Sequence, residues 1–177
     1  MSENIPPQAD ENDDLYTAMK KLSRNAQVVR SGHFIAAQRK NRNAKIIGAL
    51  VIVLNVLIGS GLIETATNDQ TAVKIIIKAL AFLAAALAGI QAFFNFQKEV
   101  ECHTSAGDVY SSIYRRIGLI IAEYHDTPAN RETLITDFKA LSAEYEKAND
   151  DSKGCIPTDR DYAKARAEIE KRSIERT

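Results

Sequence analysis

Two long apolar segments separated by a short polar one dominate the pattern of the chain. The first covers residues 46–63, reads IIGALVIVLNVLIGSGLI and holds no charged residue. The second covers residues 74–96, with lysines near its start and Gln91 and Asn95 near its end. About 20 apolar residues in a helix span the roughly 30 Å hydrocarbon core of a bilayer. The pattern therefore predicts an all-α membrane protein whose residues 46–96 form a two-transmembrane helical hairpin.

The first segment is apolar on all sides, whereas a surface helix of a soluble protein keeps a polar face. Its twelve Leu, Ile and Val residues contribute about −4 to −7 kcal/mol on an insertion scale, which outweighs its few polar residues. Lysine side chains at the start of the second segment can extend to the interface. We expect both segments to cross the membrane; a soluble bundle that buries the hairpin is the alternative.

Basic residues before the hairpin predict its orientation. Residues 15–45 contain eight Lys and Arg and no Asp or Glu. Lys and Arg close to a span favour the cytoplasmic side. The polar connection, residues 64–72, is too short to fold alone, so both ends of the hairpin should face the same side. We expect a multi-pass protein of the inner membrane, in contact with membrane lipids and with both termini in the cytoplasm.

The cytoplasmic extensions are predicted to be helical as well. Residues 1–14 are acidic, contain adjacent prolines and are expected to be disordered. Residues 15–45 should form a basic amphipathic helix, since apolar positions recur every three or four residues. Residues 97–177 should form a cytoplasmic helical region that continues from the second span, breaks near Pro128 and ends in a helix capped by Thr158 or Asp159.

One face of the second segment carries small and polar residues at intervals of three and four. This stripe consists of Lys74, Lys78, Ala81, Ala85, Ala88, Ala92 and Asn95. In lipid, close packing of small residues and hydrogen bonds between polar ones bring helices together. The stripe predicts an assembly face or a pore lining in a homo-oligomer, in which Lys74 and Lys78 would favour anions. Packing against Gly48, Asn55 and Gly59 of the first segment is the alternative.

Asn55 lies in the middle of the first segment, where lipid offers its amide no hydrogen-bond partner. We expect it to bond to another helix. A ring of Asn55 side chains that coordinates an ion is the alternative.

The residues that carry chemistry in other proteins do not form a recognisable site here. The sequence has no Gly-rich phosphate loop and no G-x-S-x-G motif, so no enzyme is expected. The histidines and cysteines lack metal-ligand spacing, and Cys102 and His103 are neighbours that point to different helix faces, so neither a metal nor a cofactor is expected. Both cysteines, Cys102 and Cys155, should be free thiols in a reducing compartment. The basic stretch favours lipid headgroups over nucleic acid.

After the hairpin, the stretch FNFQKEVECHTSAGDVYSSIYRRIG resembles the SLATT family of two-transmembrane effector domains. The residues that carry the resemblance are His103, Ala106, Tyr110, Arg116 and Ile117, and a linker with Pro157 before a charged C-terminal helix is also similar. The resemblance extends from residue 15 to about residue 172. It implies an effector of bacterial antiphage nucleotide-second-messenger defence, which permeabilises the membrane when a separate nucleotide-sensing or nucleotide-synthesising protein triggers it. A non-conducting membrane anchor or scaffold is the alternative.

Overall fold

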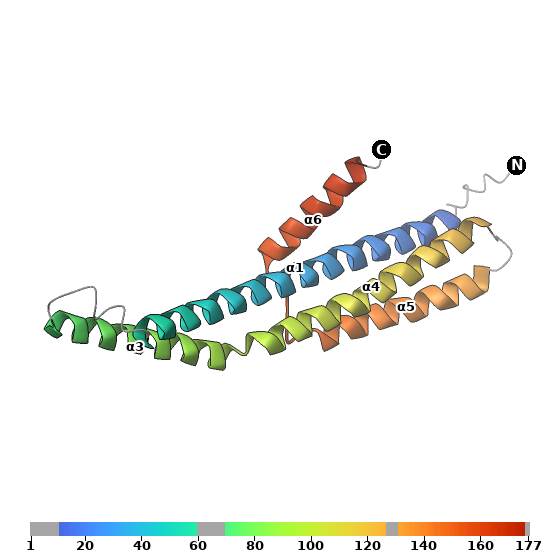
Figure 1. Ribbon diagram of the computed structural model, residues 1–177. Coiled ribbons are helices and arrows are strands. Elements are labelled where there is room, and N and C mark those ends of the chain that lie inside the picture. The colour runs from blue at the N-terminus through green and yellow to red at the C-terminus, as the bar shows by residue number, and fades with distance from the viewer. Residues whose placement is uncertain (1–10, 60–69, 127–130, 176–177) are drawn as a thin grey trace, which may run out of the picture. The chain divides into compact units, whose positions relative to one another are not determined.

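A computed structural model describes residues 11–59, 70–126 and 131–175, and the regular structure in these ranges is helical (Figure 1). The helices are α1 (Glu11–Gly59), α3 (Gln70–Phe94), α4 (Phe96–Asp126), α5 (Arg131–Asp151) and α6 (Asp159–Ile174). The predicted all-α class is therefore confirmed. Two helical stretches, 14–59 and 71–124, contain windows long and apolar enough to cross a membrane. The predicted polar connection lies largely outside the described residues.

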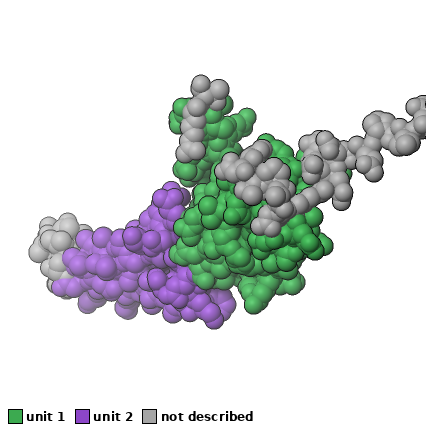
Figure 2. Space-filling model, turned by 90° about the vertical axis from the view of Figure 1, so that its right-hand side faces the viewer, with its two compact units in different colours: residues 1–36, 102–177 green, residues 37–101 purple. Residues whose placement is uncertain are grey.

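The chain divides into two compact units, which Figure 2 shows in different colours. Unit 1 consists of residues 1–36 and 102–177, and unit 2 consists of residues 37–101. Unit 1 therefore contains the N-terminal part of α1, most of α4, and α5 and α6. Unit 2 contains the C-terminal part of α1, all of α3 and the first residues of α4, and includes both apolar segments.

The core of unit 1 forms where α1, α4 and α5 pack together. Its buried members are Met19 and Ala26 of α1, Tyr110, Ile113, Ile117 and Ile120 of α4, and Leu134, Leu141 and Ala148 of α5. On each helix these residues are separated by three, four or seven positions, so they share one face. In the sequence, apolar residues recur at intervals of three and four along residues 15–37, 100–124 and 134–145, which predicts these faces of α1, α4 and α5, and the structure confirms them.

The start of α6 matches its sequence signal. The Thr158 hydroxyl accepts a hydrogen bond from the Asp161 backbone N–H, and the Asp161 carboxylate accepts one from the Thr158 backbone N–H. This capping box satisfies two backbone donors that have no partner inside the helix. The prediction that Thr158 or Asp159 caps the last helix is confirmed, with Thr158 as the cap.

Two predicted boundaries are wrong. Residues 11–14 were expected to be disordered together with residues 1–10, which are not described, but α1 begins at Glu11. Acidic residues suit this position because the start of a helix carries partial positive charge. The second predicted span also does not run unbroken into the next helix, since Asn95, with a φ of 39°, separates α3 from α4. Asn tolerates this left-handed conformation better than most residues, and its carbonyl accepts the Lys98 N–H at 2.9 Å.

Unit 2 is a helical hairpin, in which α3 returns alongside the C-terminal part of α1 (Figure 1). The backbone of Gly48 on α1 lies next to Gln91 on α3, where an added Cβ would lie 3.8 Å from the Gln91 Nε2 atom. Elsewhere in unit 2 an ion pair links α1 to the start of α4, where Lys40 Nζ lies 2.6 Å from a carboxylate oxygen of Glu99. The sequence prediction of a paired hairpin agrees with this arrangement.

Candidate functional site

The surface of the hairpin is apolar and largely uncovered. The exposed large apolar residues are Ile46, Leu50, Ile52, Val53 and Val56 on α1, and Ile75, Ile76, Phe82, Leu83, Ile90, Phe93 and Phe94 on α3, each 41% to 84% exposed. In the most apolar window of each stretch, 0% and 11% of the residues are buried. An apolar patch of this extent marks a contact with another molecule or with lipid. The exposure does not fit a soluble bundle that buries the hairpin.

The predicted stripe lies on the open side of α3. All seven residues, Lys74, Lys78, Ala81, Ala85, Ala88, Ala92 and Asn95, are exposed. The buried face of α3 lies beside the stripe. It is formed by Val73 and Ala84, which are buried, and by Leu80 and Leu87, which are half-buried. Packing of the stripe against α1 within one hairpin therefore does not describe this structure. The stripe stays a predicted assembly face or pore lining.

Two asparagines of the hairpin, Asn55 and Asn95, have local roles in the structure. Asn55 is exposed, and its side-chain amide donates to the Val51 carbonyl of its own helix at 2.9 Å. The expectation that Asn55 bonds to another helix is thus not met within one chain, because the preceding turn supplies an acceptor. Asn95, the last residue of the stripe, occupies the break between α3 and α4.

The residues that resemble the SLATT family lie on α4 in unit 1. His103, Tyr110 and Ile117 are buried, and Ala106 is half-buried against the same core. Arg116 is on the outer side, where its guanidinium forms an ion pair with Glu144 of α5. These residues therefore fix how α4 packs against its neighbours.

Two histidines meet in the interior of unit 1. His33 of α1 and His103 of α4 are 2% and 3% exposed, and their Nδ1 atoms lie 3.3 Å apart. The Tyr110 ring packs on His33 with centroids 5.6 Å apart, while its hydroxyl donates to Asn149 Oδ1 at 2.7 Å. Burial, and then the nearby His103, lowers the pKa of His33 to about 4. His33 is therefore a neutral imidazole at neutral pH.

The cysteine prediction is wrong, because Cys102 and Cys155 form a disulfide between α4 and the linker that follows α5. The linker also brings Cys155 to the histidines, so that the Sγ atom of Cys155 and one ring nitrogen from each of His33 and His103 lie within 4.8 Å of one another. Sequence spacing missed this cluster because its members come from three separate segments. The signal was the position of both histidines on the apolar faces of their helices, which had to meet in the core.

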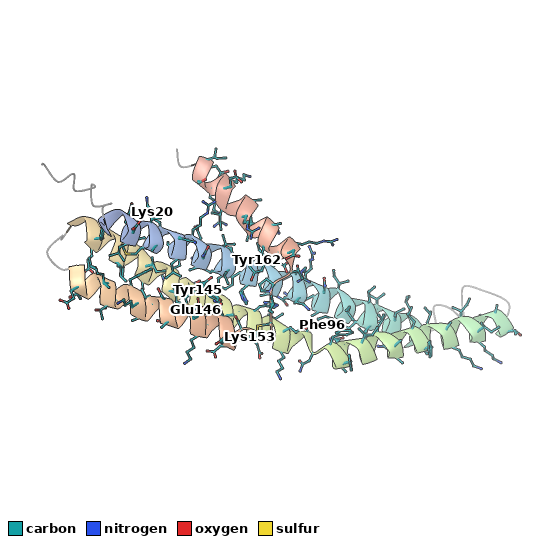
Figure 3. All side chains as sticks on the ribbon, turned by 180° about the vertical axis from the view of Figure 1, so that it is seen from behind. Lys20, Phe96, Tyr145, Glu146, Lys153 and Tyr162 are labelled. Atoms are coloured by element: carbon teal, nitrogen blue, oxygen red, sulfur yellow. A yellow bond between two sulfur atoms is a disulfide. The ribbon has the colours of Figure 1, made fainter. Side chains whose placement is uncertain are left out.

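A second feature that the sequence did not reveal is a cleft of about 1190 Å³ in unit 1. Residues of α1, α4, α5 and α6 line it, among them Lys20, Arg24, Tyr145, Tyr162 and Arg166, and Figure 3 labels Lys20, Tyr145 and Tyr162. Basic and tyrosine side chains outnumber acidic ones along its walls. The cleft can accept a partner or ligand that carries negative charge.

Unit 1 should lose stability in strong alkali because of Tyr145. Burial raises its pKa from 10.0 to about 12, with further contributions from charge on the neighbouring Tyr110, Tyr162 and Glu146. The unfolded chain releases this proton near pH 10 and the folded chain only near pH 12, so stability is constant below pH 10 and falls between the two values. Because Tyr145 is half-buried, we expect a loss of about 1 to 2 kcal/mol.

Urea unfolding of the detergent-solubilised protein, followed by far-UV circular dichroism from pH 8 to pH 12, measures this loss. Tyr145→Phe should flatten the alkaline decline, because phenylalanine has no proton to release. An equal decline in wild type and variant would assign the effect to other groups.

The fold and the geometry of these sites do not assign the chain to a characterised group. No protein-family model, curated protein or solved structure matches it. The SLATT resemblance therefore stays a prediction that depends on the residues of α4. What the structure establishes is an all-α chain with two helices that are long and apolar enough to cross a membrane.

Proposed function

We propose that this chain is a membrane-embedded effector whose hairpin crosses the bilayer and assembles with other copies to permeabilise it. The observation that carries this proposal is the apolar surface of unit 2, whose large apolar side chains lie on the outside of the hairpin. Burial of apolar surface contributes about 25 cal/mol per Å², so leaving so many large side chains in water is costly. A hydrocarbon environment removes that cost.

The orientation that we propose follows from charge. Residues 15–45 carry only basic charges and lead directly into the first apolar segment. Unit 1 and both termini would then face the cytoplasm, with the basic residues close to lipid phosphates. In that arrangement the helices of unit 1 are available to a cytoplasmic trigger.

Assembly between chains is supported by the open stripe on α3. A single hairpin has too few helices to enclose a channel, whereas several copies joined through the small residues Ala81, Ala85, Ala88 and Ala92 can surround one. Lys74 and Lys78 lie on the same stripe near one end, where a ring of them would favour anions. The stripe is exposed and therefore free to make these contacts.

The SLATT resemblance adds a biological setting to this proposal. It implies antiphage defence at the inner membrane, triggered by a separate protein that senses or makes a nucleotide second messenger. A cyclase or a nucleotide sensor encoded by a neighbouring gene would support this setting.

Ala85 and Ala86 provide a matched pair for testing assembly. Both are exposed residues of α3, but only Ala85 lies on the stripe. Ala85→Leu should reduce both dye release from vesicles reconstituted with purified protein and the number of chains per lipid nanodisc, because the larger side chain keeps helices apart. Ala86→Leu should leave both measurements close to wild type. A monomeric, non-leaking wild type that Ala85→Leu does not alter would contradict pore formation and favour a membrane anchor.

The cleft in unit 1 favours the second candidate function, a non-conducting scaffold. Its basic residues and tyrosines could hold an acidic segment of a soluble partner near the membrane. In this case Arg24→Glu together with Arg166→Glu would abolish recruitment, while the stripe variants would have no effect.

A further inference from the structure

We propose that the reduced chain binds one zinc ion through His33, His103, Cys155 and Cys102. The first three already place one ligand atom each within 4.8 Å of the other two. All three are buried, with 2%, 3% and 6% of their surface exposed. The fourth, Cys102, precedes His103 on α4 and is bonded to Cys155.

The separation of the two imidazoles suits a tetrahedral ion. The Nδ1 atoms of His33 and His103 lie 3.3 Å apart. Zinc binds histidine nitrogen at about 2.0 to 2.1 Å, so two such ligands at a tetrahedral angle lie about 3.3 to 3.4 Å apart. In the metal-free chain this spacing serves a hydrogen bond between the two rings, and it equally fits one ion bound by both nitrogens. Cys155 approaches both from the linker after α5, and so the ligands converge from three segments.

The cysteines can complete the site only as thiolates, because a sulfur atom in a disulfide is a poor ligand for zinc. Cys102 and Cys155 line a cavity of about 220 Å³ together with Ser105, Val109 and Asp151. This opening gives a small reductant access to the disulfide. Cys102 and His103 point to different faces of α4, but the Cys102 sulfur is bonded to Cys155, which lies at the histidines. After reduction, rotation of the Cys102 side chain would therefore bring its sulfur toward the ion.

Two thiol molecules supply both electrons that reduce the disulfide, and zinc keeps its oxidation state when it binds. Two thiol molecules, R–SH, reduce the Cys102–Cys155 bond and leave as R–S–S–R, which produces two protein thiols. Zinc then displaces both thiol protons to solvent and binds the two thiolates and two neutral imidazoles. The reductant is the cytosolic thiol pool, so this step rests on the proposed cytoplasmic orientation of unit 1.

Two imidazoles and two thiolates with no open position are the donor set of a structural zinc site. Paired cysteines in a reducing compartment also more often bind metal than form a lasting disulfide. The ion would connect more helices of unit 1 than the disulfide does. The disulfide joins α4 to the linker, whereas the metal would also attach α1 through His33. Redox state and zinc supply would therefore control how α1 is fastened inside unit 1.

Cobalt titration of the full chain tests this inference, because Co²⁺ replaces zinc and absorbs visible light. The protein is purified in mild detergent, and one half is reduced and kept free of oxygen. The reduced sample should bind one equivalent of Co²⁺, with the intense bands of a tetrahedral ion and a thiolate charge-transfer band. The oxidised sample should show neither. This comparison needs no variant.

Variants then identify the ligands. Cys155→Ser and His33→Gln should each weaken cobalt binding by more than about 100-fold, since even residues that only support ligands cost 10- to 100-fold. Asp151→Asn, which changes a carboxylate in the lining of the same cavity, should retain the wild-type spectrum. Circular dichroism shows whether each variant is folded.

The inference is overturned if the reduced wild type binds no stoichiometric cobalt. It is also overturned if the spectrum lacks thiolate bands and survives Cys155→Ser. Vesicle leakage has no bearing on either outcome, so failure of pore formation and failure of the metal site are separate results.

Discussion

Aspartate at two exposed positions of α1, Ile52→Asp combined with Val56→Asp, is expected to abolish stable insertion of the chain into membranes. Both residues lie near the middle of the first apolar segment and are 65% and 59% exposed. An aspartate at the centre of a span costs about 2.5 to 3.5 kcal/mol, so the pair costs about 5 to 7 kcal/mol. That cost is as large as the whole favourable contribution of the apolar residues of the segment. The variant should move from the pellet to the supernatant when membranes are extracted with alkaline carbonate.

The matched control replaces equally exposed apolar residues of unit 1. Leu119 and Ile174 are 69% and 70% exposed, and Leu119→Asp with Ile174→Asp should leave the chain in the pellet. If the Ile52 and Val56 variant also stays in the pellet, the hairpin does not hold the protein in the membrane. If wild type is found in the supernatant, the membrane proposal fails altogether.

The sequence was sufficient to predict the helices and their faces. Apolar residues spaced by three and four identified the sides of α1, α4 and α5 that become buried in unit 1, because helical periodicity puts such residues on one face. Thr158 identified the start of α6 in the same way, since its hydroxyl can cap only a helix that begins just after it. Predictions of this kind depend on local geometry alone.

Features that depend on tertiary contacts could not be predicted from the sequence. Cys155 reaches Cys102 only because the linker after α5 folds back onto α4. The contact between His33 and His103 depends on how α1 and α4 pack side by side. Each required knowledge of which helix faces meet, which periodicity does not provide.

The same limit applies to the hairpin. The sequence located the stripe on α3 but left two partners open, another chain or the first apolar segment. The structure shows that a different face, with Val73 and Ala84, is the buried one. The stripe and the packing face are neighbouring sides of one helix. Hydropathy does not separate them along the middle of the helix, because the alanines of the stripe are as apolar as the residues of the packing face.

A cavity at the centre of unit 1 is expected to have the largest effect on its stability. Ile113 of α4 is fully buried, in the same core cluster as Met19 and Leu141. Ile113→Ala removes buried methyl and methylene groups and leaves space that the rigid helices cannot close, which costs about 2 to 5 kcal/mol. For a unit of this size, the midpoint of thermal unfolding should fall by about 10 °C or more. Tyrosine fluorescence measures it, since all six tyrosines belong to unit 1 and the chain has no tryptophan.

Leu119→Ala is the control on the same helix, because Leu119 is 69% exposed and its removal should change stability by less than about 0.5 kcal/mol. The comparison also tests whether unit 1 has its own core. If Ile113→Ala lowers the unfolding midpoint and Leu119→Ala does not, α4 is held by the packing of its inner face. If the two variants unfold at the same temperature, interactions outside this core hold unit 1 together, and the assignment of the buried face of α4 is wrong.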